Sequence, residues 1–87
     1  MINNLEAYKV FYYVAKCGSV TKAAGELSIS QPAVSQAVKQ LENTLDVSLF
    51  HRAAKGVRLT GEGELLYSYV AKAVSYTHLT LPTILLV

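Results

Sequence analysis

The segment that most restricts the fold is Thr21–Glu42, TKAAGELSISQPAVSQAVKQLE, because it holds two helical patterns on either side of a very short break. The first pattern covers about residues 21–28. Its inward-facing apolar residues are predicted to be Ala23, Ala24 and Leu27. Residues 28–30, Ser-Ile-Ser, interrupt it, and Pro32 follows in the first turn of a new helix, where a missing N–H costs nothing. Since so short a first helix is unstable alone, it must pack on its neighbours.

The second pattern, which starts near Pro32, has an apolar side and a polar side. The residues predicted to hold it to the core are Val34, Val38, Leu41 and Leu45. The residues of the opposite side are Pro32, Ser35, Gln36, Lys39 and Asn43. Ser30 or Gln31 is expected to cap its start. The polar side offers hydrogen-bond donors and acceptors without an acid, although a surface helix could have been covered with Glu and Lys.

One further helical stretch is predicted before the break. Residues 4–17 form an amphipathic pattern, which Gly18 ends in the left-handed conformation. Ser19 or Thr21 is expected to cap the short helix that follows. Gly25 inside that helix costs about 1 kcal/mol relative to alanine.

A small hairpin and a last helix are predicted after the third helix. Short β-prone runs occupy Leu49–Arg52 and Val57–Leu59, and Gly56 suits a turn with positive φ. Thr60 is expected to cap a helix that continues to about Ala73. One face of this helix is predicted to carry Leu65, Leu66, Tyr69 and Ala73. The glycines predicted to weaken its first turn are Gly61 and Gly63. The fold class is therefore mainly α with a small β-hairpin.

Length and charge limit the possible functions. The 87 residues form one domain at most, and the net charge of +2 is only mildly basic. The charge is unevenly distributed, because the segment between Phe50 and Thr60 contains bases and no acid. Its basic or titratable residues are His51, Arg52, Lys55 and Arg58. A local basic patch on a nearly neutral chain indicates binding to an anion on one face.

Several classes of site are not expected. The single cysteine, Cys17, excludes an internal disulfide and a multi-cysteine zinc site. His51 and His78 are scattered, and no paired carboxylates, metal-ligand spacing or phosphate loop occurs, so we expect no catalytic, metal or cofactor site. The start of the chain lacks the pattern of a signal peptide, and no run approaches the ~20 apolar residues of a membrane span. The expected location is the cytoplasm.

The order of elements indicates a winged helix-turn-helix, in which the second helix packs across the third and leaves its outer face free for the DNA major groove. Gln31 or Gln36 could bind adenine, and Lys39 could reach guanine or a phosphate. The other candidate contacts are Ser35 to a base or backbone oxygen, and Pro32 and Ala33 to a thymine methyl group. Free N–H groups at the helix starts are phosphate donors, which places Thr21 among the backbone contacts.

The hairpin tip, HRAAKGVR, can lie along a phosphate backbone or enter the minor groove. Arg52 and Lys55 are its strongest candidate contacts. The alternatives are a charged hairpin edge that prevents sheet pairing, and a third helix that is only solvated. Together, the polar face of the third helix, the two helix starts and the basic hairpin favour binding to nucleic acid. A winged-helix module that contacts only proteins is the alternative function, and it would more often expose aromatic anchors on the third helix.

The residues GSVTKAAGELSISQPAVSQAVKQLENTLDVSLFHR, followed by GVRLTGEGELL, closely resemble the N-terminal DNA-binding domain of LysR-type bacterial transcriptional regulators. The resemblance covers about residues 5–69 and implies a helix-turn-helix at about residues 19–38. It implies DNA contacts at the positions of Ser30, Gln31, Pro32, Ser35, Gln36 and Lys39, and at Arg52 and Lys55 in the wing. Gly25 and Gly61 depart from the usual family residues and are expected to loosen the second and fourth helices.

The same resemblance implies a wider organisation. It implies a DNA-binding domain over residues 1–60 and, over residues 61–73, the start of a linker helix that pairs with a second subunit. Family members bind partly palindromic operators as dimers or tetramers. Their small-molecule effector binds a C-terminal domain, to which nothing in this chain corresponds.

The tail, residues 74–87, loses the helical pattern and the charged residues of the preceding helix. Its codons from Val74 to Thr83 can be written as a transposon-end adapter used in preparing DNA sequencing libraries. We therefore expect the natural protein to continue differently after about Ala73. The alternative is a genuine apolar extension.

Overall fold

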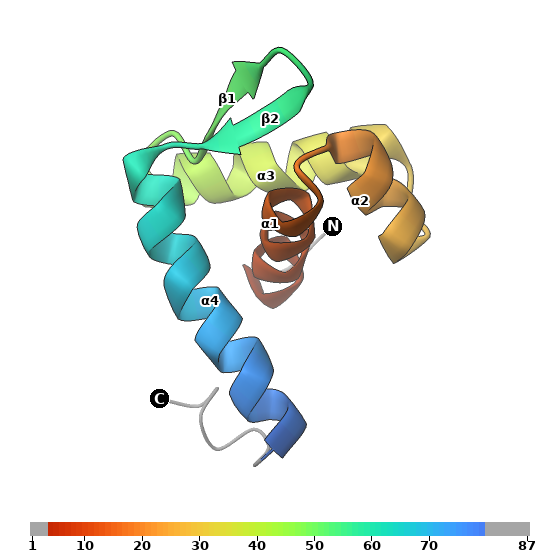
Figure 1. Ribbon diagram of the computed structural model, residues 1–87. Coiled ribbons are helices and arrows are strands. Elements are labelled where there is room, and N and C mark those ends of the chain that lie inside the picture. The colour runs from red at the N-terminus through yellow and green to blue at the C-terminus, as the bar shows by residue number, and fades with distance from the viewer. Residues whose placement is uncertain (1–3, 80–87) are drawn as a thin grey trace.

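The computed structural model describes the backbone of residues 4–79 and the side chains of residues 5–73 (Figure 1). The elements are α1 (Asn4–Cys17), α2 (Val20–Leu27), α3 (Gln31–Leu45), β1 (Phe50–Ala53), β2 (Gly56–Leu59) and α4 (Gly61–Leu79). The hairpin rises beside α3, α1 lies across the opposite side of α3, and α4 extends away from the other elements. This order confirms the predicted arrangement of helices and hairpin.

The break between α2 and α3 is a left-handed residue followed by a cap. Ser28 ends α2 with φ 58°, and the Ser30 hydroxyl oxygen accepts a hydrogen bond from the Ala33 N–H at 3.2 Å. Ser30 is thus the cap of α3, one of the two predicted residues. The cap of α2 is Ser19, whose hydroxyl accepts from the Lys22 N–H at 3.2 Å, so the alternative cap Thr21 is wrong.

The core consists of two apolar clusters, with residues of α1 in both. The buried residues of the first cluster are Val10, Val14, Ala23, Ala24, Val34 and Ala37. Those of the second are Ala7, Phe11, Leu41 and Leu49. The alanines of α2 and α3 let the helices approach closely, which fixes α2 across α3. Burial of this apolar surface is the main stabilisation available to the short helix α2.

The apolar side of α3 differs in part from the prediction. Val34 and Leu41 are buried and Val38 is half-buried, as expected, and Ala37 is also fully buried. Leu45 is 37% exposed and is wrong as a core residue. Its spacing matches that of the other apolar residues of α3, but it lies in the last turn of the helix, past the cluster around Leu41.

The hairpin pairs Phe50 with Leu59 and Arg52 with Val57 in antiparallel register. Its strands are shifted slightly from the predicted ranges, because Leu49 lies outside β1. Leu49 is fully buried, and its carbonyl accepts a hydrogen bond from the Thr60 N–H at 3.0 Å. Position 49 therefore joins the hairpin to the start of α4.

The first turn of α4 is capped by Thr60, as predicted, through a bond from the Gly63 N–H to the threonine hydroxyl at 3.0 Å. Gly63 is buried against the Leu49 carbonyl, with which an added Cβ would collide. The prediction that Gly63 merely weakens the helix is therefore incomplete, because this close approach requires glycine. The helix continues to Leu79 rather than Ala73, so residues 74–79 are helical although the helical pattern was predicted to be lost there.

The predicted apolar face of α4 is divided in the structure. Leu66, Tyr67 and Val70 pack against the second cluster, and Tyr67 stacks on Tyr12 of α1 with ring centroids 5.5 Å apart. Leu65 and Tyr69 are 62% and 64% exposed. Helical spacing correctly grouped Leu65 with Tyr69. It did not show that the core would cover the neighbouring residues Leu66, Tyr67 and Val70 instead.

Candidate nucleic-acid interface

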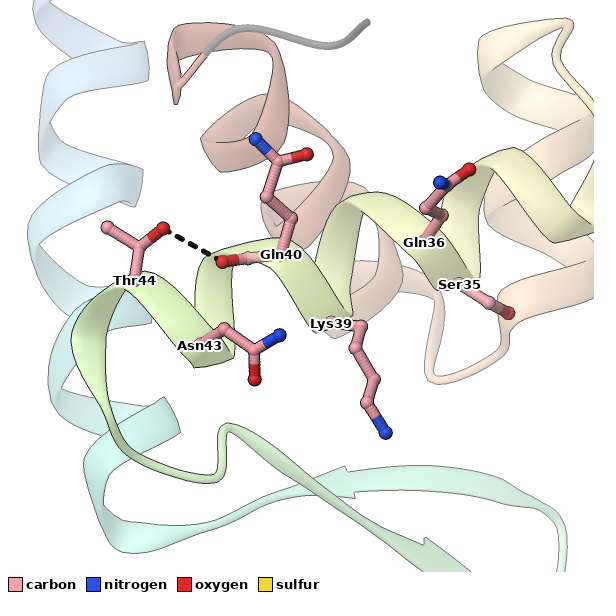
Figure 2. A pocket seen from close by; sticks show the side chains of 6 residues that line it. All are labelled: Ser35, Gln36, Lys39, Gln40, Asn43 and Thr44. Carbon is pink, nitrogen blue, oxygen red and sulfur yellow. Dashed lines mark hydrogen bonds between the residues drawn. The ribbon is translucent and has the colours of Figure 1, made fainter.

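The outer face of α3 carries two parallel rows of polar side chains that line an open pocket (Figure 2). One row is Ser35, Lys39 and Asn43, and the other is Gln36, Gln40 and Thr44. Within each row the residues are four positions apart, which places their side chains one above another on the helix. In Figure 2, Lys39 extends from α3 on the hairpin side, whereas Gln36 and Gln40 extend on the other side.

The electrostatic character of this face depends on where the acid of α3 lies. Lys39 is the charged residue among those that line the pocket. Glu42, the only acid in the α3 sequence, is half-buried. Its Oε2 atom accepts hydrogen bonds from the Leu49 N–H at 2.7 Å and the Phe50 N–H at 3.4 Å. The outer face therefore presents neutral donors and acceptors with one positive charge.

The first turn of α3 presents the remaining predicted contacts. Gln31 and Pro32 are exposed, and Ala33 is half-buried. Ser30 is exposed, and its hydroxyl oxygen accepts the capping bond, which leaves the O–H free to donate elsewhere. Thr21 is exposed in the first turn of α2, where backbone N–H groups lack partners inside the helix.

The wing, residues 50–59, is a two-stranded hairpin whose basic side chains are exposed. Arg52 lies on β1 opposite Val57, and Lys55 lies in the turn between the strands. Arg58 pairs across the hairpin with His51. The nearest acids in the sequence are Asp46 and Glu62, outside the hairpin. The wing is thus a basic projection beside the polar face of α3.

Sequence reasoning did not include Gln40 and Thr44 in this face. The Thr44 hydroxyl donates to the Gln40 carbonyl at 2.9 Å, so its side chain is held along the helix. The spacing of four from Gln36 to Gln40 and Thr44 was a signal that could have identified both. The bonds of Glu42 to the wing had no such signal, because they join residues that follow different periodic patterns.

Among the residues that the structure describes, no group of three or more His, Cys, Asp or Glu side chains could hold a metal ion. No helix within residues 4–79 is long and apolar enough to cross a membrane.

Residues 5–64 match the family described as bacterial regulatory helix-turn-helix proteins of the LysR family. The chain belongs to this LysR family. It is 41% identical over 69 residues to the HTH-type transcriptional regulator GltR of Bacillus subtilis (strain 168), a match that covers 79% of the chain and 23% of that protein. It is 47% identical over 66 residues to the RuBisCO operon transcriptional regulator of Allochromatium vinosum, covering 76% of the chain and 22% of that protein. The chain therefore spans less than a quarter of these two relatives.

Solved LysR-family structures share the fold. The DNA-binding domain of BenM in complex with catB site 1 DNA has a TM-score of 0.80 and 35% identity, covering 85% of this chain and 83% of that one. The DNA-binding domain of CbnR in complex with DNA has a TM-score of 0.75 and 29% identity, covering 83% of each chain. These likenesses confirm the predicted winged helix-turn-helix fold and family.

Proposed function

We propose that this chain binds double-stranded DNA in a sequence-dependent manner to regulate transcription. The observation that carries the proposal is the outer face of α3, which is exposed, polar and free of acidic side chains. A helix fits the major groove, where each base pair presents a distinct pattern of donors and acceptors. Neutral amides and hydroxyls can match that pattern without repulsion from the phosphates.

Within this proposal the α3 residues have separate roles. Gln31 and Gln36 are exposed amides that can bond adenine, and Lys39 can reach guanine or a phosphate. Ser35 bonds a base or the backbone, and Pro32 contacts a thymine methyl group. Ser30 and Ala33 complete the contact surface at the start of the helix, and Thr21 approaches a phosphate at the start of α2. Gln40, Asn43 and Thr44 extend the same face.

The wing supplies contacts that do not depend on sequence. Arg52 and Lys55 are exposed, and no acid occurs in the hairpin to neutralise them. Each phosphate that they neutralise releases counterions, which makes binding dependent on salt. The hairpin would lie along the backbone or enter the minor groove beside the groove that α3 occupies.

The partner of the DNA-binding unit is proposed from family membership and from α4. The exposed Leu65 and Tyr69 suit the pairing of α4 with the same helix of a second copy, giving a dimer or tetramer on a partly palindromic operator. We assign residues 1–60 to DNA binding and residues 61–73 to the start of this linker. A small-molecule effector would bind the C-terminal domain of the family and not residues 1–73. The proposed activity is binding without catalysis, at operator DNA in the bacterial cytoplasm.

Enrichment of duplexes from a randomised pool tests this proposal. We expect the chain to enrich a motif with related half-sites, and its affinity to fall steeply as salt is raised. Relatives named as transcriptional regulators, and similar domains solved with DNA, support this expectation. Absence of any binding to duplex DNA would contradict the proposal and favour a module that contacts only proteins.

A further inference from the structure

The Glu42 side chain joins α3 to the wing. Its Oε2 atom lies 2.7 Å from the Leu49 nitrogen and 3.4 Å from the Phe50 nitrogen, and both N–H groups donate to it. Phe50 is the first residue of β1, two positions before Arg52. The 2.7 Å bond from Leu49, the residue just before β1, is a strong and directional contact to a carboxylate, and the 3.4 Å bond from Phe50 is weaker. The carboxylate therefore fixes where β1 begins relative to α3.

The other anchors of this segment come from α4. The Thr60 hydroxyl donates to the Ser48 carbonyl at 2.6 Å, and the Thr60 N–H donates to the Leu49 carbonyl at 3.0 Å. These bonds fix the base of the hairpin to the start of α4 and not to α3. The apolar contacts of Phe50 and Leu59 with the core hold the hairpin down, but they are not directional.

We propose that Glu42 is a positioning residue for DNA binding, which sets the angle of the wing relative to α3 so that Arg52 and Lys55 meet the phosphates beside the groove. This inference rests on the proposed function. Glu42 does not itself touch DNA, because its carboxylate is half-buried against Leu49 and Phe50. Its effect on binding passes through the two basic residues of the wing.

The test compares the salt dependence of binding to a short duplex of arbitrary sequence. The variants are the parent chain, Glu42→Ala, the double variant Arg52→Ala/Lys55→Ala, and the triple variant that combines all three changes. Each lost phosphate contact lowers the slope of log affinity against log salt by about one. We expect Glu42→Ala to flatten the slope by up to about two, as the double variant does. In the triple variant Glu42→Ala should add no further change.

Two conservative variants separate position from charge and from folding. Glu42→Gln keeps an oxygen that can accept the Leu49 N–H, so its salt slope should match that of the parent. Glu42→Asp keeps the charge but withdraws the carboxylate by about 1.5 Å, so it should behave like Glu42→Ala. The inference is overturned if Glu42→Ala keeps the salt slope of the parent, or if it weakens binding by the Arg52→Ala/Lys55→Ala variant as much as binding by the parent. It is also overturned if Glu42→Gln binds DNA more tightly than the parent, as simple loss of a negative charge would produce.

Amide exchange in the DNA-free protein provides an independent reading. Glu42→Ala should accelerate exchange at Leu49 and Phe50 and change the nuclear Overhauser contacts between the hairpin and α3, whereas Glu42→Gln should not. If the parent failed to bind DNA, the proposed function would fail and this measurement would still decide whether Glu42 positions the hairpin. Unchanged exchange and unchanged contacts in Glu42→Ala would overturn the positioning role itself.

Discussion

Gln31 and Gln36 carry a planar amide with both a donor and an acceptor, which distinguishes them from the other exposed residues of α3. Such an amide can bond both groups that adenine presents in the major groove. Lys39 is a point charge and can bond guanine or a phosphate, so its contact alone discriminates less between sequences. The chemistry of each side chain can therefore separate recognition of DNA bases from contact with the DNA backbone.

We expect Gln31→Ala or Gln36→Ala to relax base preference, at a cost of about 1–3 kcal/mol at one operator position. Arg52→Ala should instead weaken all sequences alike and flatten the salt dependence, because a phosphate contact carries no sequence information. Titration of a selected operator and its single-base variants measures both effects. If both glutamine variants keep the full discrimination of the parent, the assignment of this face is wrong.

Gly63→Ala should destabilise the fold by about 1–3 kcal/mol, because the added Cβ collides with the Leu49 carbonyl and the first turn of α4 must shift. Urea unfolding measures this free energy. Gly25→Ala is the matched control, since an added Cβ there meets nothing within 4 Å. That change should stabilise α2 by up to about 1 kcal/mol. Equal effects of the two substitutions would show that position 63 does not require glycine.

Elements were predictable where local chemistry decides them. The stops at Gly18 and Ser28–Ser30 and the caps at Ser30 and Thr60 follow from backbone hydrogen bonding within a few residues. The outer face of α3 followed from helical periodicity. The exposure of Leu45, by contrast, depends on where the core ends, which is a tertiary property that periodicity does not contain.

The start of α3 allows stability and binding to be separated. Ser30→Ala removes the bond to the Ala33 N–H and should cost about 1 kcal/mol of stability. Ser30→Asp keeps a capping acceptor but adds a negative charge at the DNA face, so it should unfold like the parent and bind duplex DNA more weakly. Urea unfolding and fluorescence anisotropy measure the two effects. An aspartate variant that binds as well as the parent would place Ser30 away from the phosphates.

The whole molecule combines contacts that no single pattern predicts. The wing is tied to α3 through Glu42, to α4 through Thr60, and to the turn before α2 through the Val57 N–H, which donates to the Gly18 carbonyl at 3.1 Å. Gly56 packs against that same carbonyl with φ 108°, a close approach that an added Cβ would block. The sequence predicted a hairpin and its charges, but its attachment depends on pairings between separate elements.

The exposed row on α4 leads to a prediction about assembly. Leu65→Glu and Tyr69→Glu should leave the fold intact, because both side chains are mostly exposed, and should weaken self-association of the chain. Sedimentation measures the oligomeric state, and urea unfolding checks the fold. Leu66→Glu is the contrasting variant, as Leu66 is half-buried against the core and a charge placed there should destabilise the protein. Unchanged association in both exposed variants would contradict pairing through this face.

If the outer face of α3 recognises base sequence, as proposed, a substitution on that face should change the preferred sequence. The measurement is enrichment from a randomised duplex pool by the parent chain and by Gln36→Arg, since arginine prefers guanine where glutamine prefers adenine. We expect both proteins to enrich the same motif except at one position in each half-site, where adenine is replaced by guanine. An unchanged motif for the arginine variant, with binding retained, would contradict the proposal.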